Sequence, residues 1–238
     1  MILKTEGIVL HSLKYSDSSL ISRIYTKELG LVSYIIRGVR KSKGKAGLFN
    51  PPSILELIVY NNSNKKLQNI KEYKNAVIYT SIPFNIIKTS ITLFIIELLN
   101  KCIKEEEANS LKFNFIKQSL VYLDQNDEDL AIFPAWFMVH FAAFLGFEPG
   151  NRNGNEKYFD LTSGTFIHDL PDHSYVMDEE SSMILAGLIR CDVADAGNFK
   201  LSRKERKVLI SHLISYYQYH IEGFSKMKSF DVLESILS

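Results

Sequence analysis

Apolar residues in the first 80 positions come in short runs rich in β-branched side chains, separated by polar and glycine-containing segments. Runs of this kind are typical of β-strands. They predict five strands, at residues 7–10, 20–25, 31–36, 54–60 and 75–79. A closed barrel of the OB type is favoured over an open sheet, because closure hides strand edges that would otherwise stay unpaired.

Beyond Pro83 the apolar positions recur at the spacing of an α-helix. The predicted helices lie at residues 87 to about 105, 110–123, 130–145, 178–190, 202–223 and 230–237. Asp178 is the expected cap of the fourth helix, and Ser202 with Glu205 has the spacing of a capping box at the start of the fifth. A short extended or hairpin segment is expected at residues 158–166.

These patterns predict an α+β protein with two parts. An N-terminal five-stranded OB-fold β-barrel is expected at residues 1–82, followed by a mainly α-helical bundle module at residues 83–238. Within the second part, residues 150 to about 176 are expected to form a short irregular or β insertion.

Charge is divided unevenly between the two parts, although the whole chain of 238 residues has a formal net charge of only +1. Residues 1–82 contain 13 basic and 5 acidic residues, a net charge of +8. Residues 83–238 contain the other 15 basic and 22 acidic residues, a net charge of −7. The basic N-terminal part is therefore a candidate for binding a polyanion such as nucleic acid.

The most basic segment follows the third predicted strand and combines five cations with three glycines. The cations are Arg37, Arg40, Lys41, Lys43 and Lys45. Five residues separate Gly38 from Gly44, and Ala46 stands where a nucleotide-binding P-loop needs Ser or Thr, so that motif is excluded. We expect this loop to contact phosphates, and the alternative is a solvated lysine-rich turn.

Aromatic residues lie near the basic loop in sequence, and aromatic faces beside cations suit single-stranded nucleic acid. They are Tyr25, Tyr34, Phe49 and Tyr60. Some of them are expected to belong to the core of the barrel.

Catalytic and metal-binding motifs are weak in this chain, so we expect neither an enzyme nor a cofactor. Cys102 and Cys191 lie too far apart in sequence for a CxxC pair and are predicted to be buried thiols in a reducing cytoplasm. His168 and His173 leave a metal hydrolase open as an alternative, although Pro171 between them breaks any helical spacing. The acidic residues 124–129 are interpreted as a solvated helix connection, since they lack the glycine and terminal glutamate of a calcium loop.

A second basic cluster, at the start of the helix predicted from Ser202, is a candidate site for an acidic peptide. It includes Arg203, Arg206 and Lys207. Cations in the first turn oppose the helix dipole, so a solvated face and a peptide site are both compatible with the pattern.

No membrane span or export signal is predicted. The most apolar stretch, residues 131–147, is 17 residues long and contains Pro134 and His140, whereas a membrane span needs about 20 apolar residues. Glu6 stands too early for the apolar core of a signal peptide. A cytoplasmic protein is expected.

Several segments resemble the bacterial recombination mediator family RecO. The N-terminal matches are Thr5-Glu6-Gly7-Ile8-Val9-Leu10, Tyr15-Ser16-Asp17-Ser18-Ser19-Leu20-Ile21, Tyr25-Thr26 with Gly30, and Arg37-Gly38-Val39-Arg40. The C-terminal matches are Phe144-Leu145-Gly146-Phe147-Glu148-Pro149, and Lys228-Ser229 with Leu233. The resemblance implies binding of single- and double-stranded DNA, annealing of complementary strands, and loading of RecA together with RecR onto DNA coated by single-strand-binding protein.

The same resemblance implies a nucleoid-associated protein whose helical module receives the acidic C-terminal tail of single-strand-binding protein. Many members of that family carry a four-cysteine zinc site after the Leu-Gly-(aromatic)-x-Pro element, whereas residues 150–166 contain no cysteine here. We therefore expect no metal in this loop. The alternative function from the residues alone is an OB-fold RNA-binding or translation-associated factor.

Overall fold

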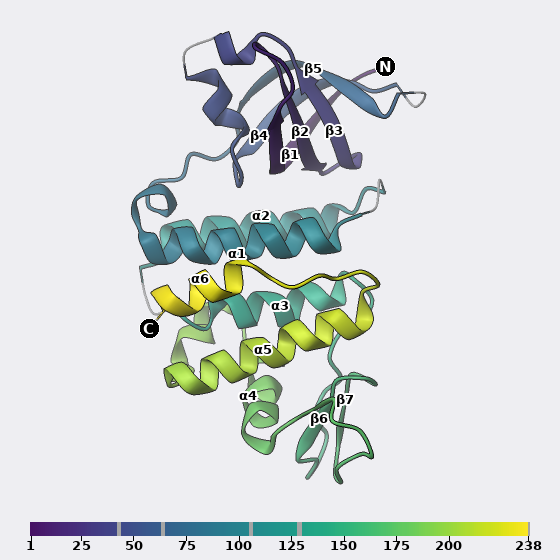
Figure 1. Ribbon diagram of the computed structural model, residues 1–238, viewed down its shortest axis with the longest axis vertical. Coiled ribbons are helices and arrows are strands. Elements are labelled where there is room, and N and C mark those ends of the chain that lie inside the picture. The colour runs from purple at the N-terminus through teal and green to yellow at the C-terminus, as the bar shows by residue number, and fades with distance from the viewer. Residues whose placement is uncertain (42–43, 63–64, 105–106, 128–129, 238) are drawn as a thin grey trace. The chain divides into compact units, whose positions relative to one another are not determined.

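A closed five-stranded β-barrel forms the N-terminal part of the protein (Figure 1). The computed structural model describes residues 1–41, 44–62, 65–104, 107–127 and 130–237. The strands are β1 (Ile2–Lys14), β2 (Leu20–Thr26), β3 (Gly30–Ile36), β4 (Ile54–Tyr60) and β5 (Leu67–Asn75). Their order around the barrel is β1-β2-β3-β5-β4, so the predicted fold class is confirmed.

Strand β1 closes one side of the barrel because it pairs with two strands. Its first half is antiparallel to β4, and its second half is antiparallel to β2. Gly7 lies where the two pairings overlap, opposite both Thr26 and Leu55. A Cβ atom at this position would lie 2.5 Å from Cγ2 of Ile24, so the close approach requires glycine.

The other side of the barrel is closed by a parallel pairing of β3 with β5, in which Ser33 lies opposite Leu67. The interior is filled by apolar side chains from the strands and from the segment between β3 and β4. Its buried members are Val9, Leu20, Ile24, Tyr34, Ile36, Val39, Phe49, Leu55, Leu57 and Val59. Phe49 packs edge-to-face against Tyr73 with ring centroids 4.9 Å apart, which anchors the β3–β4 connection to β5.

The fifth strand lies in a different place from the one predicted. Residues 75–79 were expected to form it, and that prediction is wrong, since Ile78 is 75% exposed. The strand is Leu67–Asn75, whose sequence is mostly polar and whose outward side chains are exposed. Backbone pairing with both β3 and β4 holds it in the sheet, and that pairing leaves no apolar run in the sequence.

The rest of the chain is mainly helical and contains a small sheet. The helices are α1 (Ile86–Cys102), α2 (Ser110–Gln125), α3 (Phe133–Ala143), α4 (Glu179–Ile189), α5 (Arg203–His220) and α6 (Ser229–Ile236). The sheet, of order β7-β6-β8, comprises β6 (Tyr158–Asp160), β7 (Thr165–Ile167) and β8 (Val176–Met177). The predicted hairpin is therefore confirmed, and β8 is an additional strand.

The predicted helix caps are confirmed. The Asp178 side chain accepts a hydrogen bond from the Ser181 amide at 2.8 Å. Ser202 and Glu205 form both halves of the capping box. The helix ends differ by a few residues from the prediction, and α1 ends at Cys102, before the acidic run in which residues 105 and 106 lie outside the described residues.

The apolar stretch around Pro134 is helix α3, which is buried along most of its length. Among the residues that the structure describes, no helix is long and apolar enough to cross a membrane.

By packing, the chain divides into two compact units, which we describe separately. The first comprises Met1–Phe84 and Leu98–Gln125, and the second comprises Asn85–Glu97 and Asn126–Ser238. The first unit therefore contains α2 as well as the barrel. Within it, Lys117 Nζ lies 2.7 Å from the Glu6 carboxylate, and the Asn100 side chain donates a hydrogen bond to the Leu10 carbonyl at 2.8 Å.

Asp124, at the end of α2, binds the segment that leaves the barrel. Its carboxylate accepts hydrogen bonds from the amides of Thr80 (2.8 Å), Ser81 (2.9 Å) and Ile82 (2.8 Å). Residues 124–129 were interpreted as a solvated connection, which is wrong for Asp124, because this side chain is buried. Burial alone would raise the pKa of Asp124, but the amides of Ile82, Thr80 and Ser81 together hold it below its ordinary value.

We expect Asp124→Asn to lower the free energy of unfolding by about 2 kcal/mol at neutral pH, because hydrogen bonds to a charged acceptor contribute roughly 1.5–3 kcal/mol. Folding lowers the pKa of Asp124. The stabilisation that its carboxylate provides is therefore complete at pH values above the pKa of the unfolded chain, about 4, and is lost as the pH falls through the lower pKa of the folded protein. Urea denaturation at several pH values measures this difference, which should shrink in acid. Asp17→Asn, at an exposed carboxylate, is the control, and an equal loss in both variants would contradict the role of Asp124.

Candidate nucleic-acid interface

The basic loop leaves the end of β3 and is attached to two neighbouring segments of the barrel. The Arg37 guanidinium donates a hydrogen bond to the side chain of Asn69 on β5. The Arg40 guanidinium donates to the Ser16 carbonyl at 2.5 Å, and the Arg40 amide donates to the Ser18 carbonyl at 3.1 Å. The loop is therefore fastened both to β5 and to the turn between β1 and β2.

Four of the five predicted DNA-binding cations lie exposed on this loop: Arg37, Arg40, Lys41 and Lys45. The fifth, Lys43, lies outside the described residues. Because each side chain keeps exposed surface, the loop presents several positive charges at one end of the barrel. Their assignment to DNA stays a prediction.

Most of the aromatic residues near this loop in sequence belong to the barrel and its packing. Tyr25, Tyr34 and Phe49 are buried, whereas Tyr60 is 44% exposed. Burial raises the pKa of Tyr34 well above its ordinary value, so its hydroxyl stays neutral. Tyr15, which no sequence pattern singles out for base stacking, is 61% exposed in the β1–β2 turn that Arg40 contacts. Tyr15 and Tyr60 are therefore the exposed rings of this group that a base could stack on.

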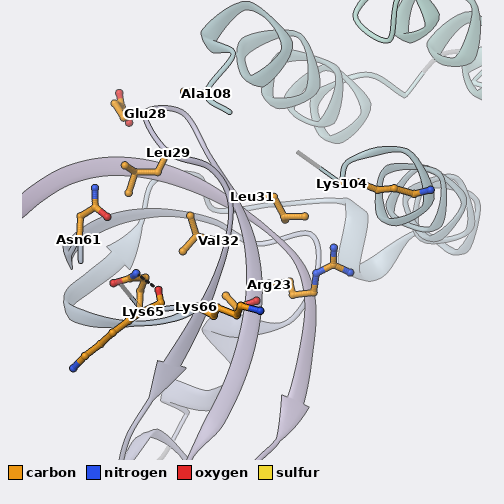
Figure 2. Close-up of a pocket in the computed structure, with 12 residues that line it drawn as sticks. Arg23, Glu28, Leu29, Leu31, Val32, Asn61, Lys65, Lys66, Lys104 and Ala108 are labelled. Atoms are coloured by element: carbon orange, nitrogen blue, oxygen red, sulfur yellow. Dashed lines mark hydrogen bonds between the residues drawn. The ribbon is translucent and has the colours of Figure 1, made fainter. Parts of the chain in front are cut away.

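A second basic surface, a groove of about 730 Å³, runs along β2 and β3 (Figure 2). Its cations are Arg23 on β2, Lys65 and Lys66 before β5, and Lys104 beyond the end of α1. Glu28, which accepts a hydrogen bond from the Thr5 hydroxyl, also lines the groove. Among the residues that the structure describes, the groove thus combines four cations with one carboxylate.

Sheet register brings these cations together. Arg23 lies opposite Ser33, and Ser33 lies opposite Leu67 on its other side, so β2, β3 and the start of β5 form one row across the sheet. The turn that carries Lys65 is held by the buried side chain of Gln68, whose amide nitrogen donates to the carbonyls of Asn62 (2.7 Å) and Lys65 (2.5 Å).

The groove and the basic loop lie along the same strand. Strand β3 leads from Ser33, beside the groove, to Arg37, the first cation of the loop. At about 3.3 Å per residue, these two positions are roughly 13 Å apart. The strand 2–3 face and the loops flanking it are where OB-folds bind oligonucleotides, so the location suits a nucleic-acid strand.

The groove residues were not among the predicted site residues, although the sequence indicates two of them in part. Lys65 and Lys66 are adjacent in a polar turn of the basic N-terminal part. Arg23 lies within an apolar strand, where its outward direction follows only from the burial of its neighbours Ser22 and Ile24. Lys104 reaches the groove from the segment beyond the end of α1, which is distant in sequence from the strands, and no local pattern indicates this.

The second predicted cluster, at the start of α5, contacts the C-terminal segment of the same unit. Lys207 forms an ion pair with Glu234 at 3.0 Å. Arg203 donates to the Glu234 carbonyl at 3.4 Å, and Arg206 donates to the Leu237 carbonyl. Leu209 and Leu213, the apolar residues that follow on α5, are buried in the core. The assignment of these three cations to a partner stays a prediction.

Comparison with known proteins covers both parts of the chain. Residues 1–79 match the family model described as Recombination protein O N terminal, and residues 83–229 match Recombination protein O C terminal. The chain belongs to the RecO family of DNA repair proteins. Similar relatives, both named DNA repair protein RecO, come from Azobacteroides pseudotrichonymphae (34% identity, 99% of each chain) and Flavobacterium psychrophilum (34% identity, 100% of each chain).

The four-cysteine zinc site expected in many RecO proteins does not fit this chain, because no cysteine lies between residues 150 and 166. In the described part of the chain, no three His, Cys, Asp or Glu side chains come together as a metal site. His173 Nε2 lies 3.6 Å from the Asp160 carboxylate. Both cysteines are free thiols, and burial raises the pKa of Cys102 to about 12.

Aromatic packing and hydrogen bonds hold the region where RecO relatives would place zinc. Phe159 is fully buried and packs edge-to-face against Phe166 (5.0 Å) and Tyr216 (5.6 Å). Burial alone would raise the pKa of Asp160, but hydrogen bonds from Thr162 and Ser163 keep it below its ordinary value. This carboxylate therefore fixes the β6–β7 turn through hydrogen bonds.

If packing holds this region, Phe159→Ala should lower the free energy of unfolding by about 3–5 kcal/mol, as expected for a buried phenylalanine. Treatment with EDTA should leave the Tm unchanged. A fold that depended on zinc would instead be destabilised by EDTA, because it would lose the free energy of metal binding. Thermal unfolding followed by circular dichroism measures both effects. Leu170→Ala, at a 62% exposed position, is the control. Stoichiometric zinc in the purified protein would contradict this account.

Proposed function

We propose that the protein is a non-enzymatic recombination mediator that binds single- and double-stranded DNA and anneals complementary strands. Together with RecR, it would help to load RecA onto DNA coated by single-strand-binding protein. The observation that carries this proposal is the basic groove continuing into a basic loop along β3 of an OB-fold barrel, in a member of the RecO family.

Positive charge on the barrel supports a role in strand annealing. Two DNA strands repel each other through their phosphates, and lysine and arginine contacts reduce that repulsion by releasing condensed counterions. Bases that stack on exposed rings such as Tyr15 and Tyr60 would stay unpaired until a complementary strand arrives. Annealing of this kind requires no covalent chemistry, so no catalytic residue or cofactor is assigned.

The acidic tail of single-strand-binding protein is assigned to the cations at the start of α5, Arg203, Arg206 and Lys207. The two guanidinium groups and one ammonium group lie on the first turns of α5, where their charges complement the carboxylates of such a tail. With these partners the protein would act in the cytoplasm at the nucleoid. Membership of the RecO family favours this function over the RNA-binding or translation-associated alternative.

Replacing the groove cations Arg23, Lys65 and Lys66 by alanine should weaken binding of single-stranded DNA irrespective of sequence. The salt dependence of log K should become shallower by roughly 2, at about 0.7 for each phosphate that the variant no longer neutralises. Fluorescence anisotropy at several salt concentrations measures the slope.

The matched control for that variant removes the same charge elsewhere on the barrel. Lys4 and Lys74 pair with Glu56, and Lys71 pairs with Glu72, all away from the groove. Alanine at Lys4, Lys71 and Lys74 should leave the slope nearly unchanged. If the two triple variants had equal slopes of log K against log salt concentration, the groove would not be the DNA-binding face.

Mediator activity is tested with complementary oligonucleotides already coated by single-strand-binding protein. The wild-type protein should accelerate their annealing, because it neutralises both strands, and the groove variant should lose most of this acceleration. Annealing followed by fluorescence quenching gives the rate. A protein that accelerated annealing of RNA but not of the coated DNA would support the RNA-binding alternative and contradict the proposal.

A further inference from the structure

The C-terminal helix α6 lies on the same α5 cations that the proposed function assigns to an acidic peptide. Lys207 pairs with the Glu234 carboxylate at 3.0 Å. Arg203 and Arg206 donate to the carbonyls of Glu234 and Leu237, at the end of the helix. A negatively charged segment of the chain itself therefore already occupies this basic site.

The start of α6 is held by one carboxylate from another helix. Glu97 on α1 accepts hydrogen bonds from the amides of Lys228 (2.9 Å) and Ser229 (2.7 Å) and from the Ser229 hydroxyl (2.6 Å). Negative charge near a helix N-terminus is favourable because it satisfies unpaired amides and opposes the positive end of the dipole. Polar contacts thus hold α6 at both ends.

A short apolar face attaches α6 between those ends. Leu233 is buried and Phe230 and Ile236 are half-buried, whereas Val232 is 48% exposed. The helix has eight residues, and an isolated helix of that length does not persist in water. Its place in the fold therefore depends on polar contacts at its two ends and on three apolar side chains, of which only Leu233 is fully buried. An element with so little buried apolar surface is one that can open locally.

In composition, α6 matches the kind of ligand that the α5 cations suit. It combines acidic Asp231 and Glu234 with the apolar side chains of Phe230, Leu233 and Ile236. We propose that the surface beneath α6, formed by the start of α5 and by Glu97 of α1, is an exchangeable docking site for an acidic peptide with apolar side chains. Helix α6 occupies this site in cis, and a partner binds by displacing it.

Exchange of this kind sets the affinity for the partner. The apparent Kd equals the intrinsic Kd divided by the fraction of protein in which α6 has left the surface. Loosening α6 without touching the cations therefore tightens peptide binding. This inference rests on the proposed assignment of Arg203, Arg206 and Lys207 to an acidic peptide.

Two substitutions in the full-length protein loosen α6 and leave all three cations in place. Glu97→Gln weakens the cap at its start, and Glu234→Gln removes the pair with Lys207. Asp231→Asn is the matched control, since it makes the same chemical change on α6 at an exposed residue that pairs with Lys226 at 3.5 Å. Hydrogen exchange at residues 229–237 reports on α6, and the anisotropy of a labelled peptide with the sequence of α6, which is acidic and has apolar side chains, reports on binding.

We expect faster exchange and at least tenfold tighter peptide binding for the double variant. Both changes should be much smaller for Asp231→Asn, because that exposed carboxylate contributes only its charge in the first turn and a surface ion pair. Adding Arg203→Glu and Arg206→Glu to the double variant should abolish the gain. Unchanged exchange in the double variant would show that these contacts do not hold α6, which overturns the inference.

The remaining outcomes separate this inference from the proposed function. If the peptide bound equally or more weakly when α6 exchanged faster, occupation in cis would be wrong and the assignment of the cations would stand. If the folded wild-type protein and the double variant both failed to bind the peptide, the assignment itself would be wrong. Binding that survived the arginine reversals would place the peptide elsewhere and contradict both.

Discussion

Closure of the barrel is the constraint on which the candidate interface depends. Strand β1 pairs with both β2 and β4, and the parallel pairing of β3 with β5 completes the ring. That second pairing places the turn before β5 beside the β2–β3 face and the end of β3 beside Asn69. Cations that lie far apart in sequence, such as Arg23 and Lys65, therefore line one groove.

Separation of charge gives the two parts of the chain different chemistry. The basic N-terminal part suits a phosphate backbone, whose contacts depend on charge and not on sequence. The remainder has a net negative charge, and its basic cluster at the start of α5 is covered by acidic α6. Because these α5 cations are already paired with α6, a ligand of this site would have to match the positions of the cations as well as their charge. A short peptide can meet that requirement more readily than a uniformly charged polyanion.

Aromatic packing and hydrogen bonds hold the insertion between α3 and α4. Phe159, Phe166 and Tyr216 form an edge-to-face cluster, and Asp160 fixes the adjoining turn through Thr162 and Ser163. Aromatic side chains bury large areas, so a few of them can hold a small sheet against a helix. Asp124 has a comparable role in the other unit, where it binds three consecutive amides of the segment after the barrel.

The sequence by itself determined the change from strands to helices near Pro83, four of the five barrel strands, both helix caps and the basic loop after β3. These features follow from local periodicity, capping chemistry and charge, because each of these patterns is complete within a short stretch of sequence. Tertiary structure decided the position of β5, the buried role of Asp124, the groove around Arg23, and the occupation of the α5 cations by α6. Each of these depends on partners distant in the sequence, and pairing between distant segments leaves no periodic signal in either one.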